Sequence, residues 1–396
     1  MPHRRIITPA LLLSISATAF AAEHVAKSPW SLEIETGVGY DSNAYLAPSE
    51  PYIDYAPATP VAVNPVTKSG IFIPVNLNTE YSGRDSNQWG AIAAYSFSGS
   101  YYPEANTENA NEYNHLLKGG IEFLLSQEGK REDTVQVTPY FGVHSKTYFN
   151  RDTGDQMVSN AGTDLSDRYS YNISGVSAKF DQETVRFPYN LHVDVARLDY
   201  IEPGSTAFDS YDHDYLLMGG DIDFPLAKPT KLTVSYDHYT RSYDEWRARD
   251  LSGNYVAGTA RKYVYNKYGA SIRQKLNNDF VVYLDYYITD RKDEYVGYYD
   301  YIKSSYGLRA IYDKDKLRIK AKALWWQRDY DNAFAFDDPS QADMSYKSAE
   351  YSIKGDYDLT KHHGLWTELK SIDQQSTDQR YEYNRYRAMV GWRWEK

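Results

Sequence analysis

The 396-residue chain contains no cysteine, which excludes both a disulfide framework and a thiolate site. Basic residues are fewer than acidic ones, with 43 lysines and arginines and 54 aspartates and glutamates. The resulting net charge of −11 argues against a general nucleic-acid binder. Beyond the N-terminal segment, no run is long and apolar enough for a membrane-spanning helix. The chain must therefore be held together by a core or by closure of a sheet.

The first residues have the pattern of an export signal. Arg4 and Arg5 precede a largely apolar stretch, and Ala19-Phe20-Ala21 offers the small-x-small pattern of a cleavage site. The stretch is too short for a membrane anchor. We therefore expect residues 1–22 to be a signal peptide and residues 23–396 to form a single domain that is exported through the periplasm.

Tyrosine is the most unusual part of the composition, with 40 residues. It favours strands, and its ring, which has an apolar body and a polar tip, suits the boundary between membrane and water. The mean hydropathy of −0.66 is typical of a soluble protein. A strand that faces lipid with alternate residues only would also keep such a polar average, so composition allows a membrane barrel with two aromatic girdles.

The chain after the signal divides into extended segments separated by turn residues. We expect roughly 16 strands, an even number as single-chain bacterial barrels require. Their expected ranges are 31–46, 70–82, 89–102, 111–126, 133–149, 166–180, 186–201, 211–226, 231–246, 260–276, 279–295, 299–312, 316–330, 346–359, 364–376 and 381–394.

Within the segments, apolar and polar residues alternate. In 316–330, for example, apolar residues alternate with Arg318, Lys320 and Lys322. A period of two puts the two sets on opposite faces of a sheet. A soluble sandwich of two sheets gives the same pattern, but its strands are typically about 5–6 residues long. The greater length of these segments favours strands that cross a membrane.

The connections between segments alternate in length. Short ones such as "QEGKRE", "AKPT" and "DKDK" are separated by longer ones such as "NRDTGDQMVSNAGTDL", although the connection around Gly297 is short as well. Tight periplasmic turns and longer outer loops are typical of outer-membrane barrels. We therefore predict an all-β fold, a transmembrane antiparallel β-barrel of about 16 strands with no plug domain.

The last segment adds a resemblance to this pattern. The sequence "YRAMVGWRW" is similar to the C-terminal strand that the barrel-assembly machinery reads in bacterial outer-membrane β-barrels of the porin type. Tyr386, Trp392 and Trp394 supply its aromatic residues and Arg387 its polar position, whereas Met389 stands where that pattern has glycine. The resemblance implies insertion into the outer membrane of a Gram-negative bacterium by that machinery.

The first segment, "ETGVGYDSNAYLAP", resembles the opening of porin-like barrels. It has a weaker likeness to the barrel portion of surface-lipoprotein assembly modifiers, in which a Gly-x-Gly-Tyr-Asp-x-Asn stretch is common. Gly37, Gly39, Tyr40, Asp41 and Asn43 carry this likeness. The assembly modifiers have a helical repeat domain before the barrel, and this sequence does not.

A barrel of about 16 strands is wide enough to leave an aqueous channel. Charged side chains on the water-facing positions are the candidates to line it. They are Arg273, Arg309, Arg318, Lys320, Lys322, Lys354, Arg385, Arg387, Glu33, Glu35, Glu122 and Asp221. Later strands contribute mainly basic residues and earlier strands acidic ones. Two outcomes are open for this charge distribution. The two walls could set up an electric field across the lumen, or the charges could simply pair between neighbouring strands.

The predicted function is a porin-like channel for passive diffusion of small hydrophilic solutes, with anionic solutes and saccharides among the candidates. The alternative is a non-conducting barrel that serves surface binding, polysaccharide or protein export or assembly, or envelope integrity. We expect no enzymatic activity, catalytic residue, metal site or cofactor. The expected partners are outer-membrane lipid, lipopolysaccharide, the barrel-assembly machinery and the solutes, with a homo-oligomer left open and nucleic acid excluded.

Overall fold

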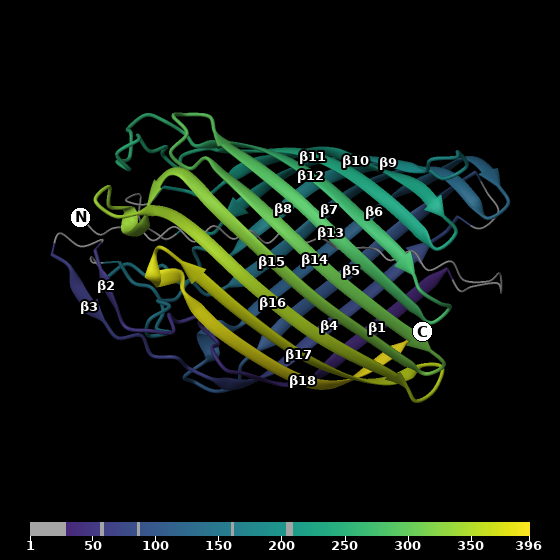
Figure 1. Ribbon diagram of the computed structural model, residues 1–396, viewed down its shortest axis with the longest axis horizontal. Coiled ribbons are helices and arrows are strands. Elements are labelled where there is room, and N and C mark those ends of the chain that lie inside the picture. The colour runs from purple at the N-terminus through teal and green to yellow at the C-terminus, as the bar shows by residue number, and fades with distance from the viewer. Residues whose placement is uncertain (1–28, 56–58, 85–87, 160–161, 203–208) are drawn as a thin grey trace.

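A computed structural model describes residues 29–55, 59–84, 88–159, 162–202 and 209–396. The expected signal peptide lies outside these residues. The described chain forms one closed antiparallel barrel of 16 strands, strongly tilted against its long axis (Figure 1). No helix in the described ranges has the length and apolar character needed to cross a membrane.

The barrel strands follow one another around the wall in chain order. They are β1 (Trp30–Asp41), β4 (Gly70–Ser82), β5 (Trp89–Tyr101), β6 (Glu112–Glu128), β7 (Arg131–Lys146), β8 (Tyr171–Gln182), β9 (Tyr189–Tyr200), β10 (His213–Ala227), β11 (Thr230–Tyr243), β12 (Lys262–Lys275), β13 (Phe280–Asp293), β14 (Tyr301–Lys314), β15 (Leu317–Phe334), β16 (Asp343–Asp358), β17 (His363–Ser376) and β18 (Tyr383–Glu395).

Closure of the barrel depends on pairing between the first strand and the last. β1 pairs with β18 in antiparallel register from Glu33 opposite Glu395 to Asp41 opposite Arg387. Gly37 faces Gly391 at the middle of this seam, where a Cβ atom on Gly391 would lie 2.3 Å from the backbone oxygen of Thr36. The two glycines therefore allow the close approach of strands that leaves no open sheet edge.

The outer face of the wall is apolar. Val38, Val176, Val195, Leu369 and Val390 each expose about half of their side-chain surface on this face. Their direct partners across the strands include one another, as Val38 faces Val390 and Val176 faces Val195. Such a band of exposed aliphatic side chains matches the lipid-facing surface of a transmembrane barrel.

Aromatic side chains lie on both sides of this apolar band. On β18, Trp392 lies nearer the end with short turns and Tyr386 nearer the end with long loops, with Ala388 and Val390 between them. Rings on neighbouring strands also contact each other: Tyr286 lies against Tyr306 and Tyr236 against Tyr268 in tilted arrangements, and Trp325 meets Tyr351 edge-on. This arrangement corresponds to the expected girdles at the two membrane boundaries.

The connections confirm the predicted alternation. Short turns join β4 to β5, β6 to β7, β8 to β9 and every second pair thereafter, and the chain's C-terminus lies at this end of the barrel (Figure 1). The long loops emerge at the opposite end. There the first loop adds a small hairpin of β2 (Tyr52–Asp54) and β3 (Val61–Val63), which the sequence pattern did not reveal.

Strand number and type agree with the prediction, and the differences lie at strand ends. The first strand ends at Asp41 rather than at residue 46, because the Asp41 carboxylate accepts a 3.0 Å hydrogen bond from the Asn43 amide and starts a turn. The Asn43 side chain then donates to the Ala47 carbonyl at 2.9 Å. β15, in contrast, continues to Phe334, beyond the expected end.

The two faces of β8 provide a direct test of the membrane placement. Val176 points outward and Ser177 inward, where Ser177 is directly opposite Asp194 of β9. We predict that Val176→Arg lowers the free energy of unfolding by about 2–4 kcal/mol, because it buries a charge in lipid. Ser177→Arg, the matched control, should change it by less than about 1 kcal/mol. Urea titration in lipid vesicles measures both values, and equal effects would contradict the assigned faces.

Candidate functional site

The third long connection, residues 147–170, folds into the mouth of the barrel. Its Arg151 is buried and donates a 2.8 Å hydrogen bond from Nε to the carbonyl oxygen of Leu46 in the first loop. The same guanidinium lies 5.5 Å from the ring centroid of Tyr381 and 5.2 Å from that of Tyr383, on the β18 side of the wall. Burial lowers the pKa of Arg151. The loop thus crosses part of the lumen instead of extending outward.

The first loop packs against this inward loop. The ring of Tyr45 meets Phe149 edge-on at 4.7 Å between centroids, and its hydroxyl donates to the Asn106 carbonyl at 3.0 Å. Gly154, at a φ of 76°, lies so close that a Cβ atom would be 2.2 Å from the Tyr45 ring. Burial raises the pKa of Tyr45 to about 12, so this hydroxyl stays neutral and able to donate near neutral pH.

Two further loops, residues 335–342 and 377–382, complete the packed rim. Asp378 is fully buried, accepts a 3.0 Å hydrogen bond from the Phe336 amide and forms an ion pair with Arg380 at 2.5 Å. Phe336 adopts a φ of 59°, an unfavourable conformation for a bulky residue. Its ring is enclosed by Arg380, Tyr52 and Tyr55, which links this rim to the β2–β3 hairpin of the first loop.

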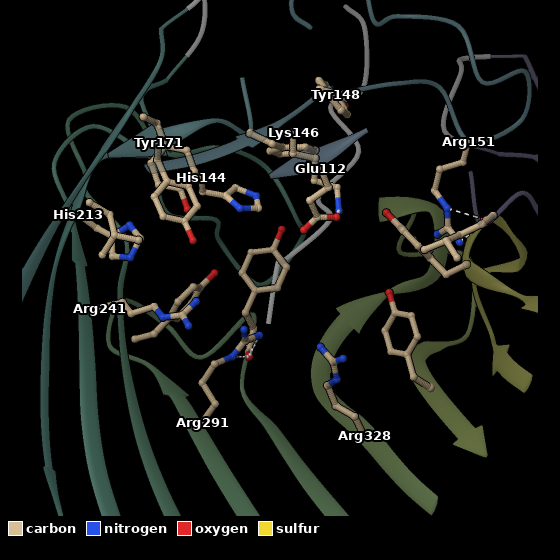
Figure 2. A pocket seen from close by; sticks show the side chains of 18 of the residues that line it. Glu112, His144, Lys146, Tyr148, Arg151, Tyr171, His213, Arg241, Arg291 and Arg328 are labelled. Carbon is tan, nitrogen blue, oxygen red and sulfur yellow. Dashed lines mark hydrogen bonds and ion pairs between the residues drawn. The ribbon is translucent and has the colours of Figure 1, made fainter. Parts of the chain in front are cut away.

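A cavity of about 520 Å³ lies between these loops and the inner wall. Its floor and sides come from β6 to β13 and β15 to β18, with Tyr299 just before β14, and Tyr45, Tyr148 and Arg151 close it from the loop side. Figure 2 shows Arg241, Arg291 and Arg328 directed into the same space that Arg151 and Tyr148 border. Its volume falls within the range of about 300–1,000 Å³ that is usual for ligand sites.

Arginine and tyrosine alternate along the wall of this cavity. Arg241 of β11 and Arg291 of β13 lie 5.7 and 6.0 Å from the centroid of the Tyr265 ring between them. Arg291 and Arg328 of β15 share Tyr330 in the same way, at 5.4 and 5.8 Å. We call Arg241, Arg291 and Arg328 the arginine row. Each cation–π contact of this kind contributes about 0.5–2 kcal/mol.

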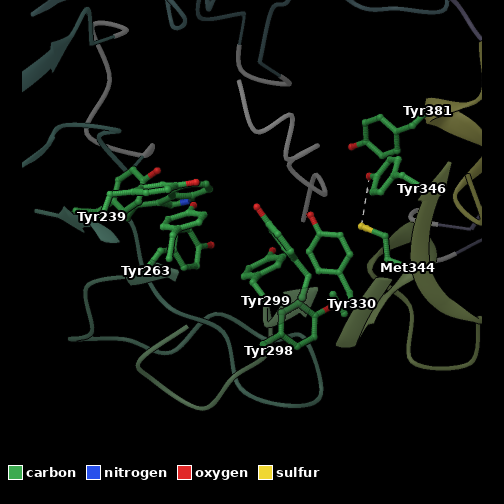
Figure 3. Packing of buried hydrophobic residues seen from close by; sticks show 13 residues of the cluster. Tyr239, Tyr263, Tyr298, Tyr299, Tyr330, Met344, Tyr346 and Tyr381 are labelled. Carbon is green, nitrogen blue, oxygen red and sulfur yellow. Dashed lines mark hydrogen bonds between the residues drawn. The ribbon is translucent and has the colours of Figure 1, made fainter. Parts of the chain in front are cut away.

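A cluster of buried tyrosines supports the arginine row. Figure 3 shows the rings of Tyr263, Tyr299, Tyr330 and Tyr346 gathered along the inner wall. Tyr263 and Tyr346 belong to β12 and β16, whereas Tyr299 precedes β14 and accepts two hydrogen bonds from Arg291 on its carbonyl oxygen. Several rings contact the guanidinium groups of Arg291 and Arg328, and one contacts that of Arg241, so ring packing restrains the orientation of the arginine row.

The register places all the pore-lining candidates on the inner face. Directly opposite pairs share a face, and Arg273 is opposite Tyr283, Arg309 opposite Lys322 and Lys320 opposite Lys354. The other candidates follow from the same ladders: Glu35 with Arg393, Glu33 with Glu395, Glu122 with Gln136, Asp221 with Ser235, Arg318 with Asp356, Lys370 with Arg387 and Ile372 with Arg385. In contrast, Tyr386, Trp392 and Trp394 occupy the outer face of β18.

Several of these charges pair with neighbours. Lys354 lies 2.8 Å from Glu35, and Arg309 binds Asp285 through two hydrogen bonds of 2.8 and 3.0 Å. Arg385 binds Asp41, as does Arg387 at 3.4 Å. The sequence left two alternatives open for the charges of the lumen, a field across it or pairing between neighbouring strands. The structure shows pairing for many of them. Lys320 and Lys322 differ, since neither forms an ion pair within the described residues.

Sequence reasoning missed the arginine row and Arg151. Arg241 lies between Tyr239 and Tyr243 at alternate positions, and Arg328 is followed in the same way by Tyr330. This recurring alternation of arginine with tyrosine was the available signal. Histidine patterns were weaker guides: His192 contacts Asp237 at 3.1 Å, and the described residues contain no group of three potential metal-binding His, Cys, Asp or Glu side chains.

The closed barrel, its apolar outer face and its polar, charged inner face define the class of protein. The chain is a transmembrane antiparallel β-barrel of sixteen strands. This class rests on the chain's own architecture: sixteen antiparallel strands, short turns at one end, and long loops at the other, one of them folded into the lumen.

Comparison with known proteins yields similarity in structure only. No model of a protein family matches the sequence, and no curated protein matches it. An anion-selective porin from Comamonas acidovorans is 11% identical with a TM-score of 0.45, over 93% of this chain and 98% of that one. In-vitro folded OmpT, an outer membrane protein of Vibrio cholerae, is 11% identical with a TM-score of 0.43, over 95% and 100% of the two chains. A mutant of the Rh. blastica porin is 13% identical with a TM-score of 0.36, over 93% and 100%.

Removal of the Arg151 side chain tests whether it fastens the inward loop. We predict that Arg151→Ala speeds amide hydrogen exchange at Asn150 and Gly154, which hydrogen-bond within the loop, by about tenfold or more. Lys68→Ala is the control, because Lys68 lies 4.0 Å from a largely exposed Asp155 and such pairs contribute little. Unchanged exchange in Arg151→Ala would show that other contacts hold the loop.

Proposed function

We propose that this protein is an outer-membrane channel through which small hydrophilic solutes diffuse passively, with a preference for anions. The observation that carries the proposal is the wet inner face of a closed sixteen-strand barrel, narrowed by an inward loop that leaves a cavity bordered by arginines. A charged lining of this kind selects solutes by the sign of their charge and by their size, and not by shape alone.

The preference for anions is supported by the balance of free and paired charge. Lys320 and Lys322 stand on β15 without an ion pair in the described chain, and Lys320 is directly opposite Lys354 of β16. On this side Asp285 and Asp356 are each bound to an arginine, and Glu368 of β17 is directly opposite Lys354. The unpaired positive charges therefore set the local potential along this wall.

The proposal includes the route by which the chain reaches the membrane. Residues 1–22 would direct export to the periplasm, and the outward aromatic residues Tyr386, Trp392 and Trp394 of the last strand would be read by the barrel-assembly machinery. Outer-membrane lipid and lipopolysaccharide would then surround the apolar band. The band is also large enough for part of it to contact a second copy of the chain in a homo-oligomer.

A non-conducting barrel that acts by binding or assembly is the second candidate. It is favoured by the packing of four loops at the mouth, where Tyr45, Tyr52 and Phe336 are almost fully buried. Conductance separates the two candidates. Correctly folded protein that passes no current and copurifies with a specific macromolecule would support this candidate.

Planar-bilayer recordings test the channel. We predict stepwise current increases and, in a salt gradient, a reversal potential that favours anions. The combined substitution Arg318→Gln, Lys320→Gln and Lys322→Gln should reduce the anion-to-cation permeability ratio by about twofold or more, since it removes three positive charges from one wall of the lumen.

The control removes the same charge elsewhere. Lys130, Lys228 and Lys361 are exposed in three of the short turns, so their combined replacement by glutamine should leave the ratio nearly unchanged. Before recording, a faster gel mobility of unboiled than of boiled protein establishes that each variant has formed a closed barrel. An absence of current from such protein would refute the proposed channel.

A further inference from the structure

We propose that the arginine row is a binding site for small aromatic carboxylates, which makes passage through the lumen saturable for this class of solute. The inference rests on the proposed channel function and specifies its substrate class. The site consists of Arg241, Arg291 and Arg328 with the rings of Tyr330 and Tyr346, all of which line the cavity of about 520 Å³.

The arginine row carries positive charge that the protein does not neutralise. Within the described residues, none of its three guanidinium groups forms an ion pair. The Nε atoms of Arg241 and Arg328 are buried and have no hydrogen-bond partner at all. A charge that is largely removed from water and has no acidic partner is costly, so an anion that enters this cavity gains an ion pair that the protein itself does not supply.

The carboxylates that border the same cavity are already engaged. Glu112 lies 3.0 Å from Lys146, and Asp194 accepts a 2.5 Å hydrogen bond from Tyr140. Asp337 is bound to Arg249 at 3.0 Å. None of these three acids forms an ion pair with the arginine row, so its guanidinium groups remain available to a solute.

The chemistry of the guanidinium group favours a carboxylate as the anionic part. Arginine presents a planar fork of N–H donors that matches the two oxygens of a carboxylate. Arg291 uses part of its fork on the carbonyl of Tyr299, with hydrogen bonds of 2.9 Å from Nε and 2.5 Å from Nη2. Arg241 and Arg328 lie on either side of it and line the cavity without a carboxylate partner in the described chain, so they are the groups that bind the carboxylate.

The rings favour an aromatic body for the same solute. Tyr330 and Tyr346 both line the cavity with their ring centroids 6.2 Å apart, and the guanidinium of Arg328 lies 5.8 and 4.9 Å from the two rings. A planar ring inserted beside such faces adds stacking and contact with a guanidinium plane, which an aliphatic acid does not obtain. Saccharides lack the charge, and inorganic anions lack the ring.

Calorimetric titration of benzoate into the full-length, detergent-solubilised barrel tests the binding without requiring conductance. We expect saturable binding, with cyclohexanecarboxylate at least about fivefold weaker because it lacks a planar ring. Benzyl alcohol should show no measurable binding because it has the ring but no charge. Arg241→Gln and Arg328→Gln should each weaken benzoate binding about tenfold.

Arg273→Gln is the matched control, since Arg273 lies on the same inner face but near the short turns, outside the lining of the cavity. It should leave benzoate affinity unchanged. Arg328→Lys keeps the charge but not the fork, so affinity between those of wild type and Arg328→Gln would support recognition by the planar guanidinium. Arg291 is left intact because it also holds the Tyr299 carbonyl.

Two results would overturn the proposal: no saturable binding of benzoate to the folded wild-type barrel, or equal affinity in wild type and both glutamine variants. Benzoate block of single-channel current then connects the site to transport, with half-blocking concentrations that follow the affinities. A barrel that conducts but does not bind benzoate contradicts the site alone. One that binds benzoate but does not conduct contradicts the channel and leaves the site in place.

Discussion

Every feature of this molecule depends on the pairing of its first strand with its last. In lipid, an unpaired backbone amide or carbonyl group has no water to bind, so a sheet can cross the membrane only if it has no edge. The β1–β18 seam meets this requirement through a nine-residue register from Glu33–Glu395 to Asp41–Arg387 and through the Gly37–Gly391 contact. Once the wall is closed, alternate side chains are committed to lipid or to the lumen.

The lumen then faces the reverse problem, because charges directed inward must be solvated, paired or packed. In the part nearer the short turns, many are paired, as Lys354 with Glu35 and Arg309 with Asp285. At the mouth, the arginine row lies against tyrosine rings instead of carboxylates. Tyrosine rings stabilise a buried guanidinium group without neutralising its charge. The arginine row therefore still presents a positively charged surface to solutes.

Much of the fold was accessible from the sequence because a strand's alternation is local. The segment 316–330 already separates apolar residues from Arg318, Lys320 and Lys322, and the ladders of β15 place those three on the inner face. The arginine row escaped prediction for the opposite reason. Arg241, Arg291 and Arg328 are far apart in the chain, and only the ordering of β11, β13 and β15 around the wall brings them to one cavity. The inward course of Arg151 depends on contacts with Leu46 and Tyr381, which no local pattern encodes.

The sequence by itself determined the architecture: an even set of long alternating strands, short turns at one end and long loops at the other, and rings at the membrane boundaries. These properties follow from period-two side-chain placement and turn chemistry, which act over a few residues. Only the tertiary structure decided that the 147–170 loop bends into the lumen and that the arginine row forms no ion pair in the described chain. The course of the loop depends on contacts between residues a hundred or more positions apart. The arginine row depends on the order of β11, β13 and β15 around the wall.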